Sequence, residues 1–324
     1  YSSRVHNLSR LCHRRVTSAL VRTIENHIQM DSPQNWHCKI LLLGFLLALS
    51  ACTQAAFTAA NLPTHLVELA VEHDQAYGPD PSQKLDIYVP ADSKDKQLDV
   101  IVFFYGGRWS YGAKEDYRFV AATFGKDGFI VVIPDYRKYP QVRFPVFVED
   151  GAKALAWVSD HIGEWHGNPA RIHVVGHSAG AHIGALLAAD PHYLADEGKD
   201  RSLTIHDFAG LAGPYAFIPD EPDLEDMFGP PSNYPNMQVP TFIDGTQPPM
   251  LLLYGDKDSM VKYANLQKLE QRIKQRGGCV RSRIYPDADH TDLIGALSWW
   301  NRQRVPVVED ITTFFGACRA VGVE

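Results

Sequence analysis

The chain has 324 residues, of which 45% are hydrophobic, 11% aromatic and 21% charged. This composition can bury a large core and excludes a wholly disordered, collagen-like or coiled-coil protein. The formal net charge of -7 is uneven, because residues 1–51 hold six basic and two acidic residues and the remainder therefore carries -11. Binding to a phosphate backbone requires a cationic surface, so we expect no nucleic-acid partner.

An apolar run near the N-terminus, residues 40–51 (ILLLGFLLALSA), is followed directly by Cys52. The run is short for a membrane span and has the length of the hydrophobic region of a signal peptide. Its end, Leu49-Ser50-Ala51-Cys52, resembles a bacterial lipobox, in which the cysteine is lipidated and becomes the mature N-terminus. We therefore expect residues 1–29 to be an upstream or non-mature segment, 30–51 a lipoprotein-type signal peptide and 52–65 a tether.

The expected location follows from this reading. A protein lipidated on Cys52 is exported to the periplasm or cell envelope and anchored to a bacterial membrane, and Thr53 rather than Asp after the cysteine favours the outer membrane. An organelle transit peptide, an uncleaved anchor and ordinary signal-peptide cleavage are the alternatives. In an exported protein the two remaining cysteines, Cys279 and Cys318, could form a disulfide, because a strand start and a helix end fall on the same sheet edge.

From residue 66 onward, strand-like and helix-like segments alternate. Short apolar or alternating runs predict strands at 66–73, 85–89, 100–105, 129–134, 172–176, 208–211, 250–254 and 280–285. Helical patterns lie at 115–126, 146–161, 179–189, 261–275 and 305–320. About eight strands with intervening helices predict one α/β domain over residues 66–324, with a mostly parallel, doubly wound sheet and no large cap domain. The longest irregular stretch, residues 218–249, is a candidate pocket wall or short lid.

The pentapeptide Gly176-His177-Ser178-Ala179-Gly180 fits the pattern G-x-S-x-G and lies between a predicted strand and a predicted helix. In that setting the serine occupies a sharp, strained turn, and the glycines allow the strand and the helix to approach closely. As an isolated pattern it is often coincidental, but its context makes Ser178 a candidate nucleophile.

A serine hydroxyl is a weak nucleophile, so it needs a general base and an acid that orients the base. Asp256 and Asp258 follow the strand at 250–254, and His290 follows the strand at 280–285. All three therefore lie outside the carboxyl ends of strands, where open α/β sheets bind ligands. We expect His290 to be the base and one of the two aspartates to orient it.

These motifs resemble those of the α/β-hydrolase family, specifically the small esterase branch related to hormone-sensitive lipase. The resemblance covers most of the chain from about residue 66 and also includes YGGRW (105–109), PDYRKYP (134–140), YGDKD (254–258) and DADH (287–290). It implies an α/β-hydrolase fold and a catalytic triad of Ser178, Asp258 and His290. Asp258 is favoured over Asp256 because the family's acid is the later residue of a G-x-x-D motif.

The segment 105–109 resembles the family's H-G-G-x motif, whose backbone amides stabilise the oxyanion. Carried over by position, the donors are the amides of Gly107, Arg108 and Ala179. Tyr105 stands where the family has histidine, which leaves open how the loop is braced. The structural alternative is a plain Gly-Gly turn after a strand.

Aromatic and apolar residues near the catalytic loops are expected to line an acyl or alcohol pocket: Trp109, Tyr111, Phe217 and Leu293. His177 and His182 flank the serine and are expected to have packing or surface roles. The other histidines considered, His161, His166 and His173, lack metal-ligand spacing, so no metal is assigned.

The expected reaction is two-step hydrolysis of small or short-chain carboxylic esters through an acyl-enzyme on Ser178, with no cofactor. The substrate is a small molecule, and the only expected membrane contact is the lipid on Cys52. An amidase or arylformamidase-like hydrolase is the first alternative, because Y-G-G-x-W also resembles the H-G-G-x-W of formamidase relatives. The second is a catalytically silent, lipid-anchored binding protein on a hydrolase fold. The sequence specifies neither the particular ester nor the oligomeric state.

Overall fold

The structure is a computed structural model that describes residues 55–91, 96–299 and 301–318. The chain divides into two units, Tyr1–Ala59 and Ala60–Glu324, and only residues 55–59 of the first are described. The expected signal peptide and Cys52 lie outside the described residues. Among the helices that are described, none has the length and apolar character needed to cross a membrane.

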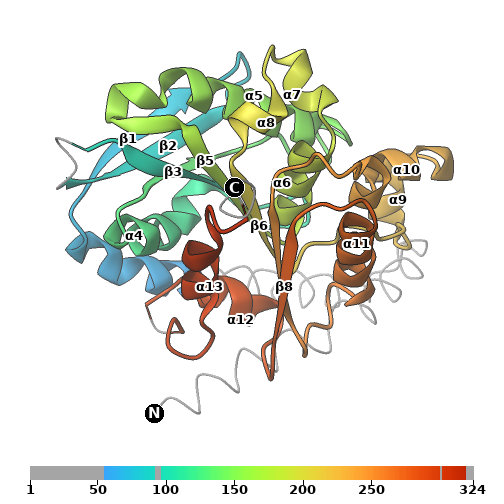
Figure 1. Cartoon of the computed structure of the whole chain (residues 1–324). Coiled ribbons are helices and arrows are strands. Elements are labelled where there is room, and N and C mark those ends of the chain that lie inside the picture. Colours follow the sequence, from blue (N-terminus) through green and yellow to red (C-terminus); the bar gives the residue numbers. More distant parts are fainter. Residues whose placement is uncertain (1–54, 92–95, 300, 319–324) are drawn as a thin grey trace, which may run out of the picture. The chain divides into compact units, whose positions relative to one another are not determined.

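The second unit is built around one eight-stranded sheet, which is shown in Figure 1. Its strands are β1 (Leu69–Ala76), β2 (Lys84–Pro90), β3 (Leu98–Phe104), β4 (Ile130–Pro134), β5 (Gly167–His177), β6 (Asp207–Leu211), β7 (Met250–Gly255) and β8 (Val280–Tyr285). Their order is β1-β2-β4-β3-β5-β6-β7-β8. The β1/β2 and β2/β4 pairs are antiparallel and all others are parallel. This confirms the predicted mostly parallel sheet.

The central strands are buried because helices cover both of their faces. The apolar run of β3 is fully buried from Val100 to Phe104, as is β4 from Ile130 to Ile133, which explains the lack of alternation in their sequences. The edge strand β8 is largely exposed and carries Arg281 and Arg283. Charged side chains on an edge strand oppose pairing with another chain.

Ten α-helices follow β3 in the described part of the chain. They are α4 (Arg118–Lys126), α5 (Val146–His161), α6 (Ala179–Ala189), α7 (His192–Asp196), α8 (Arg201–Thr204), α9 (Pro222–Phe228), α10 (Tyr234–Met237), α11 (Ala264–Gln275), α12 (His290–Gly295) and α13 (Val307–Phe314). Short 3-10 turns are η1 (Leu62–Leu66), η3 (Lys114–Tyr117), η4 (Ile162–Trp165), η5 (Pro231–Asn233) and η6 (Val239–Phe242). On one face of the sheet α4 lies near α12 and α13, whereas α5, α6 and α11 cover the other face (Figure 1).

Three sequence predictions need correction. The tether was expected to reach residue 65, but the compact unit begins at Ala60, and Asn61 accepts the amide N–H of Phe119 at 2.9 Å. The last helix ends at Phe314 rather than residue 320, because Phe315 is extended and Gly316 has φ of 75°. The stretch 218–249 is not irregular: it contains α9, η5, α10 and η6.

Candidate active site

Ser178 occupies the turn between β5 and α6. Its backbone has φ of 54° and ψ of -120°, a conformation that costs about 1–3 kcal/mol for a residue other than glycine. A Cβ atom at Gly176 would lie 2.5 Å from the carbonyl oxygen of Gly180, and one at Gly180 would lie 2.0 Å from that of Phe104. Glycine at both positions therefore lets α6 pack directly against β3 and β5. The serine remains partly exposed at the carboxyl end of β5.

The structure pairs His290 with Asp258. The Nδ1 atom of His290 lies 2.8 Å from Oδ2 of Asp258, and both side chains are buried. The other carboxylate oxygen of Asp258 accepts the backbone N–H groups of Met260 at 2.8 Å and Val261 at 2.9 Å. The carboxylate is thus fixed by its own loop while it orients the imidazole.

Asp256, the other candidate acid, has a different role. Its Oδ1 accepts the backbone N–H of Asp287 at 2.8 Å, and its side chain forms an ion pair with Lys257. It therefore joins the loop after β7 to the loop after β8. That second loop delivers His290 as the first residue of α12, whose N-terminus is closed by a reciprocal capping box between Asp289 and Asp292.

His177 holds the backbone of the base, a role that the sequence did not reveal. Its Nε2–H donates to the carbonyl oxygen of His290 at 3.1 Å, and burial lowers the pKa of His177 well below its usual value, so the ring stays neutral. A Cβ atom at Gly106 would lie 3.0 Å from Nδ1 of His177 and 3.1 Å from Cβ of Ser178. The serine, the base and the loop after β3 therefore meet around His177.

The loop after β3 makes a tight turn beside Ser178. Gly107, Arg108 and Trp109 all have positive φ, and the carbonyl oxygen of Gly107 accepts the N–H groups of Ser110 and Tyr111. A Cβ atom at residue 107 would lie 2.1 Å from the carbonyl oxygen of Tyr111, so the turn requires glycine there. Ala179 is the first residue of α6, where backbone N–H groups have no partner within the helix and the helix dipole is positive. Ala179 therefore adjoins the nucleophile, and the loop that carries Gly107 and Arg108 approaches it at Gly106.

Tyr105 braces this loop in place of the histidine found in the family. Its ring is fully buried between Tyr117 and Tyr136, and its hydroxyl donates to the Asp135 carboxylate. Burial raises the pKa of Tyr105 well above its usual value, which keeps the hydroxyl a donor. The hydroxyl of Tyr136 donates to the carbonyl oxygen of Tyr105 at 3.1 Å. The PDYRKYP motif therefore supplies the brace.

An acidic segment that includes α9 is tied to the same loop. Arg108 forms three hydrogen bonds to Asp223, from Nε at 3.1 Å and from Nη2 at 2.9 Å and 3.0 Å, and a fourth to Glu221 at 2.7 Å. Arg143 pairs with Asp226 at 2.7 Å. We call residues 218–229, which hold five acidic and no basic residues, the acidic strap.

The predicted pocket residues separate into two groups. Trp109 and Phe217 stack with their ring centres 5.7 Å apart and join His182 and Phe228 in one aromatic cluster. Tyr111 is largely exposed, whereas Leu293 is fully buried within α12. His182 lies one helical turn after the nucleophile, because its backbone N–H donates to the carbonyl oxygen of Ser178.

His182 introduces a polar atom into this cluster. Its Nε2–H donates to the carbonyl oxygen of Met237 at 2.7 Å, and burial lowers the pKa of His182 to about 4. Its Nδ1 and the indole Nε1 of Trp109 are buried and have no hydrogen-bond partner in the described part of the chain.

One group of side chains lies close enough together to hold a metal ion within residues 55–91, 96–299 and 301–318: His173, His206 and Asp207. His173 lies near the middle of β5, opposite Asp207, which is the first residue of β6. Ser178 follows the carboxyl end of β5, so the group lies away from the catalytic residues along the strand.

Comparison with known proteins agrees with the geometry of the site. Residues 85–214 match the family model BD-FAE. The chain is 27% identical over 241 residues to the probable isoprenylcysteine alpha-carbonyl methylesterase of Oryza sativa, covering 67% of this chain and 57% of the relative. It is 33% identical over 159 residues to the carboxylesterase NlhH of Mycobacterium tuberculosis, covering 46% and 49%. It thus spans about half the length of these relatives.

Solved structures share the architecture. Esterase B of Lactobacillus rhamnosis matches with a TM-score of 0.67 and 20% identity, over 83% of this chain and 93% of that one. Esterase 2 of Thermogutta terrifontis matches with a TM-score of 0.63 and 22% identity, over 77% and 95%.

The strand order, the serine on its turn and the Asp258–His290 pair are the arrangement of the α/β-hydrolase fold. In sequence the chain is similar to proteins named as esterases, and it shares its fold with solved esterase structures.

Proposed function

We propose that the protein is a serine carboxylesterase that acts on small or short-chain esters. The observation that supports this most directly is the 2.8 Å contact between His290 and Asp258, at the sheet edge where Ser178 stands on its strained turn. The curated relatives and the structural neighbours reported above are esterases by name, which supports the same class of bond.

The reaction proceeds in two steps. The Oγ atom of Ser178 attacks the ester carbonyl while His290 takes its proton, and Asp258 holds the imidazole and stabilises its charge. The amides of Gly107, Arg108 and Ala179 stabilise the oxyanion. His290 returns the proton to the departing alcohol. Water then attacks the acyl-enzyme with His290 again as base, which releases the carboxylic acid and restores the serine.

The size of the substrate is proposed from the loops. The segment between β6 and β7 consists of short helices and turns and does not form a separate cap domain. Its aromatic residue Phe217 stacks on Trp109, and Phe228 meets Trp109 edge to face. This apolar cluster favours a short apolar acyl or alcohol group.

Matched aspartate variants test this mechanism. We expect Ser178→Ala and Asp258→Asn to lower the kcat for p-nitrophenyl acetate and butyrate by about 10⁴-fold, because each triad member acts with the others. The neighbouring acid Asp256 holds only the loop, so the kcat of Asp256→Asn should stay within a few-fold of the wild-type value. A fluorophosphonate probe should label wild type and not Ser178→Ala. Undiminished hydrolysis by Ser178→Ala would overturn the assignment, and selective turnover of N-formyl aromatic amides would favour the amidase alternative.

We also propose that the protein is exported and anchored through lipid on Cys52. The lipobox-like sequence before Cys52 supports this, and the disulfide between Cys279 and Cys318 fits an oxidising compartment. In a bacterial host the full chain should incorporate radiolabelled palmitate and partition with membranes, whereas Cys52→Ser should do neither. Equal labelling of both chains would contradict lipidation at this cysteine.

A further inference from the structure

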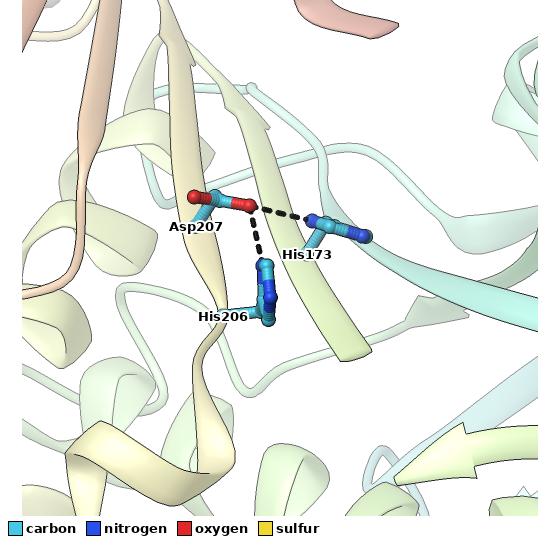
Figure 2. A group of neighbouring side chains, drawn as sticks. All are labelled: His173, His206 and Asp207. Carbon is cyan, nitrogen blue, oxygen red and sulfur yellow. Dashed lines mark hydrogen bonds and ion pairs between the residues drawn. The ribbon is translucent and has the colours of Figure 1, made fainter. Parts of the chain in front are cut away.

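Two histidines converge on one buried aspartate between neighbouring strands, as shown in Figure 2. His173 on β5 lies opposite Asp207 on β6 in the sheet register, and His206 directly precedes Asp207. The Nδ1 atoms of His173 and His206 lie 3.1 Å and 2.6 Å from the same carboxylate oxygen, Oδ2. All three side chains are buried.

The distances between these atoms suit a small cation. Bonds of about 2.0–2.1 Å in a tetrahedral Zn²⁺ site place neighbouring ligand atoms about 3.3 Å apart. The ligand atoms of this group all lie within 4.8 Å of one another, so modest side-chain adjustments would allow coordination. Two imidazoles and a carboxylate are ligands that transition metals such as zinc accept.

The neighbours of the group match the surroundings of known metal ligands. A coordinating histidine almost always donates its second ring N–H to a carboxylate, a carbonyl or water, and a coordinating carboxylate is itself hydrogen-bonded. Here Nε2 of His173 faces Asp99 at 3.5 Å, and Asp99 is held by Arg171. The N–H of Gly316 donates to Asp207 at 3.1 Å. Coordination through Nδ1 leaves the ring proton of His173 on Nε2, where Asp99 can accept it.

Hydrogen bonding alone leaves the carboxylate of Asp207 incompletely satisfied. Its other oxygen, Oδ1, is buried without a hydrogen-bond partner among the described residues. Because Oδ1 points away from both imidazoles (Figure 2), it would reach an ion held by them only if the carboxylate turned. A buried carboxylate also needs a compensating positive charge. We propose that His173, His206 and Asp207 bind one divalent transition-metal ion, which anchors the segment after α13 to the sheet.

The position of the ion determines its expected effect. The site contacts the C-terminal segment, because Phe315 stacks on His173 with ring centres 3.9 Å apart and Gly316 bonds Asp207. The catalytic residues lie at the opposite end of the strands. Metal binding should therefore stabilise the fold and leave the kcat of the esterase reaction unchanged at 25 °C.

The test uses the full chain without an affinity tag, Zn²⁺ as the probe, and two histidine variants. His206→Gln removes the imidazole but keeps an N–H donor for Asp207. His192→Gln is the matched control, because His192 lies 2.7 Å from Asp190 in an isolated pair. Wild type and His192→Gln should each bind about one equivalent of Zn²⁺ by elemental analysis after dialysis. Their unfolding midpoints should rise by about 5–10 °C at hundredfold excess over Kd.

His206→Gln should bind no stoichiometric Zn²⁺, and added Zn²⁺ should not raise its unfolding midpoint. Its circular dichroism spectrum should equal that of wild type, which shows that it folds. Two results would overturn the proposal: wild type that takes up no Zn²⁺ and keeps its unfolding midpoint, or His206→Gln that binds as well as wild type. The group would then be a hydrogen-bonded clamp that joins β5 to β6 without a metal ion. Neither readout depends on esterase activity, so the test stands apart from the proposed function.

Discussion

Individual residues at the site are held in conformations that the surrounding structure enforces. Ser178 keeps a strained backbone because Gly176 and Gly180 allow α6 to close against the sheet behind it. His177 and His182 flank the serine in sequence and both are buried and neutral, yet each fixes a different neighbour. His177 holds the backbone of His290, and His182 holds Met237. The site therefore packs in this way only while both imidazole rings are neutral.

Stability in mild acid should depend on His182. Burial lowers its pKa in the folded state from 6.5 to about 4, so the unfolded chain binds the proton more readily between these values. The stabilising contribution of the neutral ring is thus complete above pH 6.5 and is lost as the pH falls toward 4. Between pH 7 and pH 5 we expect the free energy of unfolding to fall by about 2 kcal/mol from this residue.

Urea unfolding at the two pH values measures this loss. His182→Gln retains an N–H donor for Met237 but cannot titrate, so its stability should fall by about 2 kcal/mol less than that of wild type. His161→Gln, at a more exposed histidine, should behave as wild type. Equal losses in wild type and His182→Gln would contradict the prediction.

Residues of the triad could be proposed from sequence because short motifs mark them, whereas the residues that position them could not. His177 contacts His290 across 113 positions, and Tyr105 contacts Asp135 across 30. Such partners are neighbours only once parallel strands bring their carboxyl ends together. The nearest sequence signal for the brace was the PDYRKYP motif, whose aspartate and tyrosine both contact Tyr105.

Among the elements, the acidic strap and the loop after β3 are connected by charge. Arg108 bonds Asp223 and Glu221 by its side chain, while its backbone belongs to the tight turn beside Ser178. The side chains are partly exposed, so the ion pairs contribute about 1 kcal/mol or less. The acidic strap therefore contributes to the position of the loop after β3 but does not determine it alone.

Weakening the ion pair between Arg108 and Asp223 should slow the chemical step. We expect Asp223→Asn to lower kcat by up to about fivefold with little change in KM, because the oxyanion donors act mainly in the transition state. In wild type, 0.5 M salt should lower kcat toward the variant's value, whereas the variant should respond less. Steady-state kinetics with p-nitrophenyl butyrate at both salt concentrations measures these effects.

Asp220→Asn is the matched control, since Asp220 lies on the same strap but faces Lys262 at 4.0 Å. Its kcat and salt response should equal those of wild type. If Asp223→Asn is also unchanged, the strap does not position the loop.

The sequence predicted helices and strands correctly where the hydrophobic pattern was strong. The predictions failed where contacts between distant residues determine the local structure. Each strand overlaps a predicted one, and α5 and α6 have the predicted bounds. The helices between β6 and β7 were not predicted, because they are short and rich in proline. One of them, α9, belongs to the acidic strap, which pairs with the distant residues Arg108 and Arg143.

In the molecule as a whole, the carboxyl ends of the strands and their amino ends have different roles. Ser178, Asp258 and His290 all follow strands at the carboxyl edge. Toward the amino edge, Cys279 directly precedes β8 and forms a disulfide with Cys318, with their Cα atoms 6.4 Å apart. His173 and Asp207 hold Phe315 and Gly316 close by in sequence. The segment after α13 is therefore fastened far from the chemistry.

Removing the disulfide should lower stability without altering catalysis. The two cysteines are separated by 39 residues, and closing a loop of that length stabilises the fold by about 4 kcal/mol through the chain entropy of the unfolded state. We expect the double variant Cys279→Ser/Cys318→Ser to unfold about 10 °C below wild type, with kcat at 25 °C unchanged. Dithiothreitol should lower the midpoint of wild type toward that of the variant. Dithiothreitol should not change the midpoint of the variant, which controls for the remaining cysteines. If dithiothreitol leaves the wild-type midpoint unchanged, the disulfide does not have the assigned stabilising role.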